Sequence, residues 1–409
     1  MEELKPTAAD QFFLNWPMIV LPARMIQNAS CILLGIATGI IAWHFYLPAA
    51  IFLPVIWVKT PSKKAAWLVG LGYHLAASKG LIFGVPVFFD STIFYGVFLW
   101  AVAGLIQSLP YYLFFYVRNP YLSIVFLLIS LILPPVGIVG WANPLTGAGL
   151  IFPGTGFAGL FLSLVLIFLA VWLLRKKNTW AFCLLIATVL LLPGILKPPD
   201  VRDDSFKGVS THYTGNPANI GDQFYRDYQK FTQIYGDYRQ TDFKVLALPE
   251  ASAGIWFDST KDLWGRWQKN LKNDQSIIIP TLLPVSSQGM ETYNALIEMK
   301  KDGFTVLYKA RQSVPVAMWN PWSKDNVKNN WFDDPVFEVA GKKETALICY
   351  EAYLTWPILQ SFLSGDPEII FFVANHWWSK NTSLLRIQEK CVSAWARLFN
   401  ARLISTVNH

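Results

Sequence analysis

The sequence predicts a membrane-embedded α-helical bundle of about seven helices in residues 1–197, followed by a layered α/β domain in residues 198–409. The 409-residue chain is 53% hydrophobic and only 15% charged, and its mean hydropathy of +0.35 is too high for an ordinary soluble domain. Long apolar runs stop near Lys197. Strand and helix patterns follow it in mixed order, as in an α/β domain.

Seven apolar runs in the first half approach the roughly 20 residues that cross a bilayer. The first two are the shortest. The runs cover residues 29–44, 46–58, 65–89, 91–117, 121–139, 156–174 and 178–196.

Positive charges mark alternate connections between these runs. Residues 1–197 contain 11 Lys/Arg against 4 Asp/Glu, whereas the remainder contains 23 of each. The positive-inside rule then places the first residues in the cytoplasm and, after seven crossings, residues 198–409 on the outer face of the membrane. Because the excess charge flanks membrane segments, we expect no direct nucleic-acid binding. Lys79 lies inside the third run, where a lysine either extends to the interface or has a function. The basic connections contain Arg24, Lys59, Lys63, Lys64, Arg118, Arg175, Lys176 and Lys177.

The polar half has the patterns of a mixed α/β domain. Apolar and β-branched runs predict strands, and apolar residues at helical spacing predict two helices. The helices are expected at 220–236 and 382–400, and the strands at 206–213, 243–251, 276–284, 293–300, 304–310, 345–351, 368–375 and 402–407.

Three of these strands end in a reactive side chain: Glu250 in LALPEAS, Lys309 in VLYKARQ and Cys349 in LICYEA. A thiol with a pKa of about 8.5 is mostly protonated at neutral pH, so a neighbouring carboxylate can take its proton. A lysine ammonium can stabilise both the thiolate and the oxyanion of a tetrahedral intermediate. The set suits acyl transfer from an amide or ester. Alternatively, Cys349 is an inert thiol in a buried strand and Lys309 a solvated strand-end residue.

These contexts resemble the carbon–nitrogen hydrolase (nitrilase) superfamily, whose members use a Glu-Lys-Cys triad at strand ends of an α-β-β-α sandwich. The resemblance implies that Glu250 is the general base, Lys309 the electrophilic stabiliser and Cys349 a nucleophile that carries the acyl group as a thioester. The preceding membrane segments make the chain similar to apolipoprotein N-acyltransferase, an inner-membrane enzyme that moves a phospholipid acyl chain to an amino group. No metal or organic cofactor is implied.

Three further positions match that family and are expected to support the site. Glu351 follows the nucleophile by two residues, and Asn375 and His376 lie in ANHWW, which resembles an Asn-Asp-x-Trp-Phe stretch. We expect Glu351 to have a structural or hydrogen-bonding role.

The chain also departs from the acyltransferase pattern. A second family glutamate, about eight residues after the lysine, is replaced by Ala317 or Met318, and the Asn-Asp pair reads Asn375-His376. We also expect the chain to lack the family's further strands and final membrane helix. Because of these departures and its short membrane half, the chain resembles most closely a family of plasmid conjugal transfer proteins that is related to the acyltransferase.

Three hypotheses about function follow. The first is a thioester-forming acyltransferase with a phospholipid acyl donor and an amine acceptor, such as a protein or a component of the conjugation apparatus. The second is a membrane-anchored amidase, although one helix suffices for anchoring. The third is a non-catalytic conjugation assembly factor, which the missing glutamate favours and the complete triad opposes. The tryptophan-rich segment 317–335 predicts either a lid at the lipid headgroups or a loop packed on its own domain.

Overall fold

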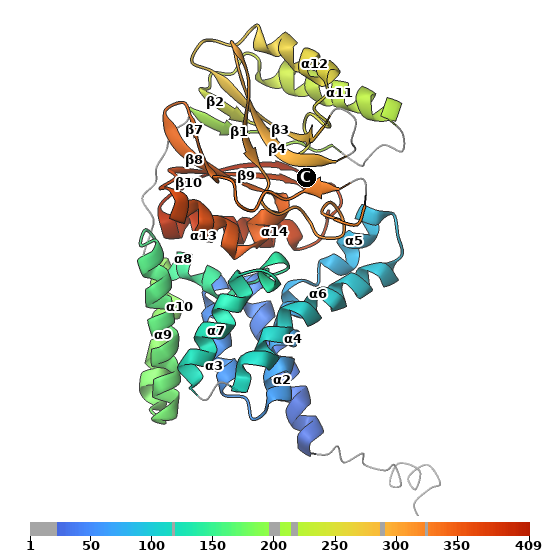
Figure 1. Cartoon of the computed structure of the whole chain (residues 1–409). Coiled ribbons are helices and arrows are strands. Elements are labelled where there is room, and N and C mark those ends of the chain that lie inside the picture. Colours follow the sequence, from blue (N-terminus) through green and yellow to red (C-terminus); the bar gives the residue numbers. More distant parts are fainter. Residues whose placement is uncertain (1–22, 117–118, 196–204, 214–219, 287–290, 324–325) are drawn as a thin grey trace, which may run out of the picture.

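The computed structural model describes the chain except residues 1–22, 117–118, 196–204, 214–219, 287–290 and 324–325. Figure 1 shows a half built of helices below a half that contains two stacked β-sheets. The expected boundary at Lys197 falls outside the described residues. The last helix before it ends at Ile195 and the first strand after it begins at Phe206.

The described helices of the helical half differ in length, from the 4 residues of α8 to the 21 residues of α6. Short 3-10 and π turns fill the connections, including a π turn at Ile41–Phe45 and a 3-10 turn at Leu47–Phe52. The helices are α2 (Ala23–Ile40), α3 (Leu53–Val58), α4 (Lys63–Ala77), α5 (Leu81–Phe89), α6 (Ile93–Leu113), α7 (Pro120–Ile132), α8 (Ala148–Ile151), α9 (Phe157–Arg175) and α10 (Thr179–Ile195).

The prediction of about seven membrane-spanning helices is not supported by these lengths. In the described residues, three helices are long and apolar enough to cross a bilayer: Ala23–Phe45, Ile93–Leu113 and Phe157–Arg175. The count is four if α4 and α5, which bend by 55° at their junction, form one broken span. Because the topology prediction assumed seven crossings, the side on which the α/β half lies stays a proposal.

Prolines explain why two of the predicted apolar runs form helices that are too short to cross a bilayer. Run 46–58 contains Pro48 and Pro54 and forms only a 3-10 turn and α3. Most of its apolar side chains are buried inside the protein, so they pack against protein rather than lipid. Run 121–139 stops at Ile132, just before Pro134 and Pro135, because proline cannot donate the hydrogen bond that continues a helix.

The α/β half contains two sheets. A six-stranded sheet has the order β1-β2-β3-β4-β5, with β6 paired to β4, and a four-stranded sheet has the order β10-β9-β8-β7. β1, β2 and β3 are mutually parallel, as are β8, β9 and β10. The strands are β1 (Phe206–Gly208), β2 (Val245–Ala247), β3 (Ser276–Pro284), β4 (Thr292–Lys300), β5 (Gly303–Lys309), β6 (Val327–Lys328), β7 (Val336–Val339), β8 (Lys342–Ile348), β9 (Ile369–Asn375) and β10 (Arg402–Asn408).

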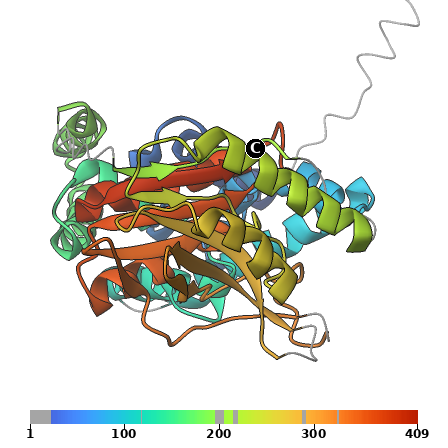
Figure 2. The same cartoon turned by 90° about the horizontal axis from the view of Figure 1, so that it is seen from above.

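The two sheets stack face to face and helices cover both outer faces, which is the α-β-β-α sandwich that was predicted (Figure 1). Helices α11 (Ile220–Tyr238) and α12 (Asp258–Gln268) pack on the six-stranded sheet, and Figure 2 shows them lying across it. Helices α13 (Thr355–Ser364) and α14 (Leu384–Phe399) pack on the four-stranded sheet. Apolar side chains of both sheets fill the layer between them.

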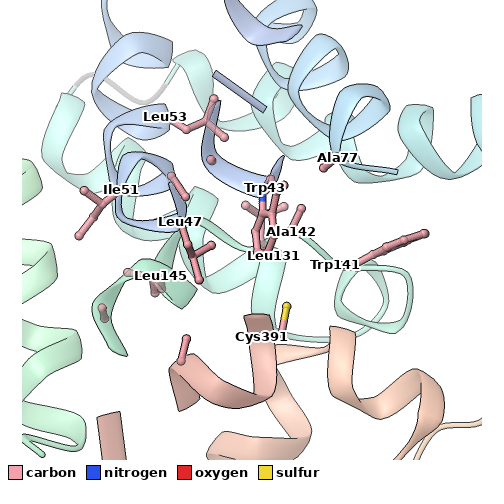
Figure 3. Close-up of a cluster of buried hydrophobic side chains, with 14 of the residues drawn as sticks. Trp43, Leu47, Ile51, Leu53, Ala77, Leu131, Trp141, Ala142, Leu145 and Cys391 are labelled. Carbon is pink, nitrogen blue, oxygen red and sulfur yellow. The ribbon is translucent and has the colours of Figure 1, made fainter. Parts of the chain in front are cut away.

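Helices α13 and α14 also join the sandwich to the helical half. One continuous core contains Ile370 of β9, Trp395 of α14 and Trp43 of the helical half. Figure 3 shows Cys391 of α14 directed toward the buried side chains of the helical half, such as Leu131 and Ala142. The helical half is therefore part of the folding unit and not a detachable anchor.

Candidate active site

The candidate site lies at one edge of the layer between the sheets. Glu250 follows β2 by three residues, Cys349 directly follows β8, and Asn375 ends β9. Because β8 and β9 are parallel, their carboxyl ends meet at the same edge of their sheet. Glu250 reaches this edge from the other sheet. Stacking therefore brings together strand ends that are almost 100 residues apart in the sequence.

Cys349 lies in a strained turn. It is the first residue of a 3-10 turn, Cys349–Tyr353, that terminates β8, so the predicted strand 345–351 ends before the cysteine. Its φ of 47° is in the left-handed region, which is unusual for a residue with a Cβ and is typical of functional sites. The Gln388 Nε2 donates a 2.7 Å hydrogen bond to the Cys349 carbonyl oxygen. This bond connects α14 to the nucleophile candidate.

Glu250 is the direct partner of the thiol. Its side chain is only 8% exposed, and Asn294 Nδ2 donates a 2.7 Å hydrogen bond to its Oε1. Burial raises the pKa of Glu250 to about 7, although hydrogen bonds from Asn294, the Cys349 thiol and the Asn375 backbone oppose the rise. A carboxyl group with a pKa near neutrality is well suited to accept and return a proton.

The thiol itself is protonated at neutral pH. Burial is the main cause that raises the pKa of Cys349 well above its usual value, and the negative charge of Glu250 adds to the rise. Hydrogen bonds from the Asn375 backbone and the Gln388 side chain act in the opposite direction. Because a free thiolate is disfavoured, Cys349 needs a base during attack, and the Glu250 carboxyl group is close enough to interact with the thiol.

Lys309 makes its described contact with Tyr293 rather than with the cysteine–glutamate pair. It ends β5 opposite Ala295, and its ammonium is 4.8 Å from the centre of the Tyr293 ring. In β4, Tyr293 and Ala295 face the side opposite to Asn294, because successive strand residues alternate. Within the described residues, no hydrogen bond or ion pair joins Lys309 to Glu250 or Cys349. The structure thus brings two of the three predicted catalytic residues together, and the role of Lys309 stays a prediction.

Glu351 stabilises the turn that contains Cys349. It is fully buried and its carboxylate accepts hydrogen bonds from Tyr308 Oη at 2.7 Å, from the Arg311 backbone at 2.8 Å and from the Ile348 backbone at 2.8 Å. The Arg311 Nε lies 3.5 Å from the same carboxylate. The Ile348 contact closes the turn that contains Cys349, and the Tyr308 and Arg311 contacts tie this turn to the end of β5, which supports the expected structural role.

Asn375 and His376 both lie beside the site. The Asn375 side chain accepts a 2.7 Å hydrogen bond from Asn408 Nδ2. His376 Nε2 is 2.5 Å from Gln388 Oε1, and its Nδ1 is 2.6 Å from Ser379 Oγ. Since the Gln388 amide nitrogen already donates to Cys349, its oxygen must accept, so Nε2 of His376 carries the proton. Burial lowers the pKa of His376 to about 4, which keeps the ring neutral in this network.

Three site residues were not found from the sequence: Asn294, Arg311 and Gln388. Arg311 is almost fully buried and donates to Tyr308 Oη at 2.9 Å and to the carbonyl oxygen of Ala346 at 3.1 Å. Asn294 is the third residue of β4. A polar amide inside a predicted strand is the sequence signal that could have marked it. Gln388 is one of several polar residues on α14, so its contact with Cys349 arises only in the tertiary structure.

The tryptophan-rich segment 317–335 was predicted to be either a lid at the lipid headgroups or a loop packed on its own domain, and its tryptophans differ in their surroundings. Trp331 packs on its own domain, because its Nε1 donates to Gln312 Oε1 at 3.1 Å and its carbonyl accepts from Gln360 at 3.0 Å. The rings of Trp319 and Trp331 meet edge to face. Trp322, in contrast, is 92% exposed. Among the described residues, no group of three His, Cys, Asp or Glu side chains is arranged to hold a metal ion.

The fold and the site together define a membrane-associated α-β-β-α sandwich protein with a buried cysteine–glutamate pair. No family model matches the sequence. A probable conjugal transfer protein TraB from Sinorhizobium fredii is 31% identical over 95% of this chain and 98% of its own length. The conjugal transfer protein TraB from Agrobacterium fabrum is 30% identical over 93% of this chain and 92% of its own length. The chain belongs to the TraB family of conjugal transfer proteins.

Solved structures of the nitrilase superfamily match about half of the chain at low identity. A Nesterenkonia amidase of this superfamily is 13% identical, with a TM-score of 0.36, and the match covers 52% of this chain and 78% of the amidase. A carbon–nitrogen hydrolase from Helicobacter pylori is 12% identical, with a TM-score of 0.36, and the match covers 50% of this chain and 75% of the hydrolase.

Proposed function

We propose that this protein is a cysteine-dependent acyltransferase of the bacterial inner membrane that acts in plasmid conjugation. The observation that carries the proposal is the proximity of the Cys349 thiol to the buried Glu250 carboxyl group, which are close enough for each to shift the pKa of the other. A nucleophile paired with a base of pKa about 7 is the arrangement that covalent acyl transfer needs.

The proposed reaction has two halves. In the first, Glu250 takes the thiol proton, the Cys349 sulfur attacks an ester carbonyl, and the leaving alcohol departs with the proton from Glu250. In the second, an amine attacks the thioester, Glu250 takes the amine proton, and the sulfur leaves and is protonated again. The Asn375 backbone and the Gln388 amide stabilise the sulfur anion when the thiol loses its proton before attack and again when the sulfur leaves the thioester. With water in place of the amine, the same site would hydrolyse the thioester.

A phospholipid is the proposed acyl donor because the site is built onto apolar helices. Helix α14 contacts the sheet with one face and the helical half with another (Figure 1). The start of α2 and the basic turn between α9 and α10 lie at the end of the bundle away from the sheets. By the positive-inside rule, this arrangement supports a periplasmic α/β half.

A second candidate is a non-catalytic assembly factor in conjugation. The position of Lys309 over Tyr293 favours it, as does the absence of a carboxylate at Ala317 and Met318. An amidase uses the same Glu250 and Cys349 chemistry, and it differs from the acyltransferase in releasing a free acid.

Transfer frequency of a plasmid that encodes Cys349→Ser separates these functions. The proposal predicts that the transfer frequency falls at least tenfold, because a serine hydroxyl is a weak nucleophile at neutral pH without a stronger base. Cys183→Ser is the matched control, since Cys183 is exposed on α10, and it should transfer at the wild-type frequency. Transfer by Cys349→Ser at the wild-type frequency would favour the assembly factor.

A further inference from the structure

Three basic side chains gather where α14 crosses the helical half. Arg386 and Lys390 lie one turn apart on α14, and Lys79 lies at the break between α4 and α5. All three are close enough to interact electrostatically with His44, near the end of the Ala23–Phe45 helix. Three elements thus direct positive charge toward one point.

Contacts with residues of the Ala23–Phe45 helix fix two of these cations. Lys390 Nζ donates a 2.9 Å hydrogen bond to the Trp43 carbonyl oxygen. Arg386 Nη2 lies 3.4 Å from His44 Nδ1. Since the guanidinium can only donate, Nδ1 accepts, and the proton of the ring is on Nε2, which lies 3.4 Å from the Ala76 carbonyl oxygen. His44 is therefore neutral and cannot contribute to the positive charge.

The cluster carries three positive charges without a carboxylate partner. In the part of the chain that the structure describes, no ion pair involves Lys79, Arg386 or Lys390. Glu389 is adjacent in sequence, but the group with which it interacts electrostatically is His409. Burial and the charge of Arg386 lower the pKa of Lys390, as expected for cations that repel one another.

The cluster is open to a ligand from the bilayer side. Lys79 and Arg386 are exposed and Lys390 is half-buried. His44 lies near the end of the candidate span Ala23–Phe45 that faces the sheets, and the end of a span lies at the level of the lipid headgroups. Lys79 lies at the break between α4 and α5. We propose that Lys79, Arg386 and Lys390 form a binding site for the phosphate group of an anionic phospholipid. A planar guanidinium and two ammonium groups suit phosphate oxygens.

This site is distinct from the cysteine site. Gln388, which contacts Cys349, lies two residues from both Arg386 and Lys390 on α14. At 100° per residue, its side chain is on the opposite face of the helix from the cluster. The lipid site therefore does not depend on the proposed acyl transfer, and it can be tested without turnover.

The test uses the full chain in detergent and native mass spectrometry with phosphatidylglycerol, phosphatidylcholine or inorganic phosphate as the probe. The variant replaces Lys79, Arg386 and Lys390 by glutamine. Each removed charge is expected to weaken phosphatidylglycerol binding about fivefold, and the triple variant about a hundredfold. A matched control replaces Arg175, Lys176 and Lys177, which are three charges at the opposite end of the bundle, and it should bind as the wild type does.

The proposal also predicts that phosphatidylglycerol binds the wild type more tightly than phosphatidylcholine, which has no net charge. Unchanged binding by the cluster variant, or an equal loss in the control, would overturn it. Displacement of the lipid by an equal concentration of inorganic phosphate would overturn the lipid assignment in favour of a free anion. If the triple variant does not fold, Lys79→Gln and the charge-preserving Arg386→Lys replace it, with about fivefold weaker and unchanged binding expected.

Discussion

The two ends of the layer between the sheets both contain buried carboxyl groups, but their surroundings differ. At one end, Glu250 and Glu351 accept hydrogen bonds around Cys349. About 16 Å away along β8, at 3.3 Å per residue, Glu344 is fully buried, and neither of its oxygens has a partner among the described residues. Its neighbour Glu298 contacts Lys300 at 3.1 Å. Burial alone therefore does not identify a catalytic carboxylate, whereas contact with a nucleophile does.

The pKa values follow the same division. Burial raises the pKa of Glu344 to about 9, and the charge of Glu298 adds to the rise. Glu250 rises only to about 7, because three hydrogen bonds stabilise its charged form. Glu250 can thus exchange protons at neutral pH, and Glu344 is an uncharged acid there. The experiments below compare the two ends.

Glu250→Gln should have the largest effect. The amide cannot accept the thiol proton, so the rate of Cys349 acylation is expected to fall about 10²- to 10⁴-fold. In the wild type, this rate should rise as pH increases through about 7, because Glu250 becomes a carboxylate there, and the rise should be lost in the variant. Single-turnover acylation measured from pH 5 to 9 checks this. Glu344→Gln, the matched control, should keep the wild-type pH profile.

Glu351→Gln should destabilise the fold. Arg311 would remain buried without its countercharge, and breaking a buried pair costs about 3–5 kcal/mol. Denaturant unfolding of the full chain in detergent measures this. Glu298→Gln serves as the control, because its partner Lys300 is 48% exposed and loses little. Equal stability of Glu351→Gln and wild type would show that the buried pair does not hold the nucleophile turn.

Glu344→Gln should change how stability depends on pH. In the wild type, the unfolded chain loses the Glu344 proton above its ordinary pKa of 4.5, while the folded chain keeps it up to about 9. The free energy of unfolding therefore falls with pH in this window, by at most about 1.4 kcal/mol per unit. The variant should lose this contribution. Identical pH slopes of the two proteins between pH 6 and 8 would contradict the account.

Lys309→Met should have the smallest effect on the thiol. Because the Lys309 ammonium lies over Tyr293, the rate at which iodoacetamide alkylates Cys349 is expected to stay within about twofold of the wild-type rate. A tenfold fall would mean that the lysine reaches the thiolate in solution. Measuring acylation in the same variant shows whether Lys309 acts later, on the oxyanion.

The strands of the α/β domain were predicted well because they carry local patterns, whereas the α-β-β-α arrangement was expected only from the family resemblance. Strand 276–284 was located at its full length, and the helix expected at 382–400 is Leu384–Phe399. Helix α13 was missed, since TWPILQSFLS is short and contains proline. The membrane spans were overcounted for a different reason: hydropathy does not distinguish side chains that face lipid from those, such as Trp57, that are buried in protein.

The candidate site was only partly predictable. Glu250 and Cys349 could be located because each follows a buried strand, and polar residues at strand ends carry a clear signal. Asn294 and Gln388 lie inside a strand and a helix, where a polar residue usually has a local or solvent-exposed role. Their contacts with Glu250 and Cys349 depend on stacking of the sheets and docking of α14, which no short motif encodes.

The most direct test of the central claim is covalent labelling with an alkyne-tagged phospholipid. The purified full chain is incubated with the lipid in detergent, and the adduct is tested with hydroxylamine, which cleaves thioesters. The account predicts a hydroxylamine-sensitive adduct on the wild type and on Cys183→Ser, and none on Cys349→Ala. A folded wild type that forms no adduct, or an adduct of equal intensity on Cys349→Ala, would contradict it.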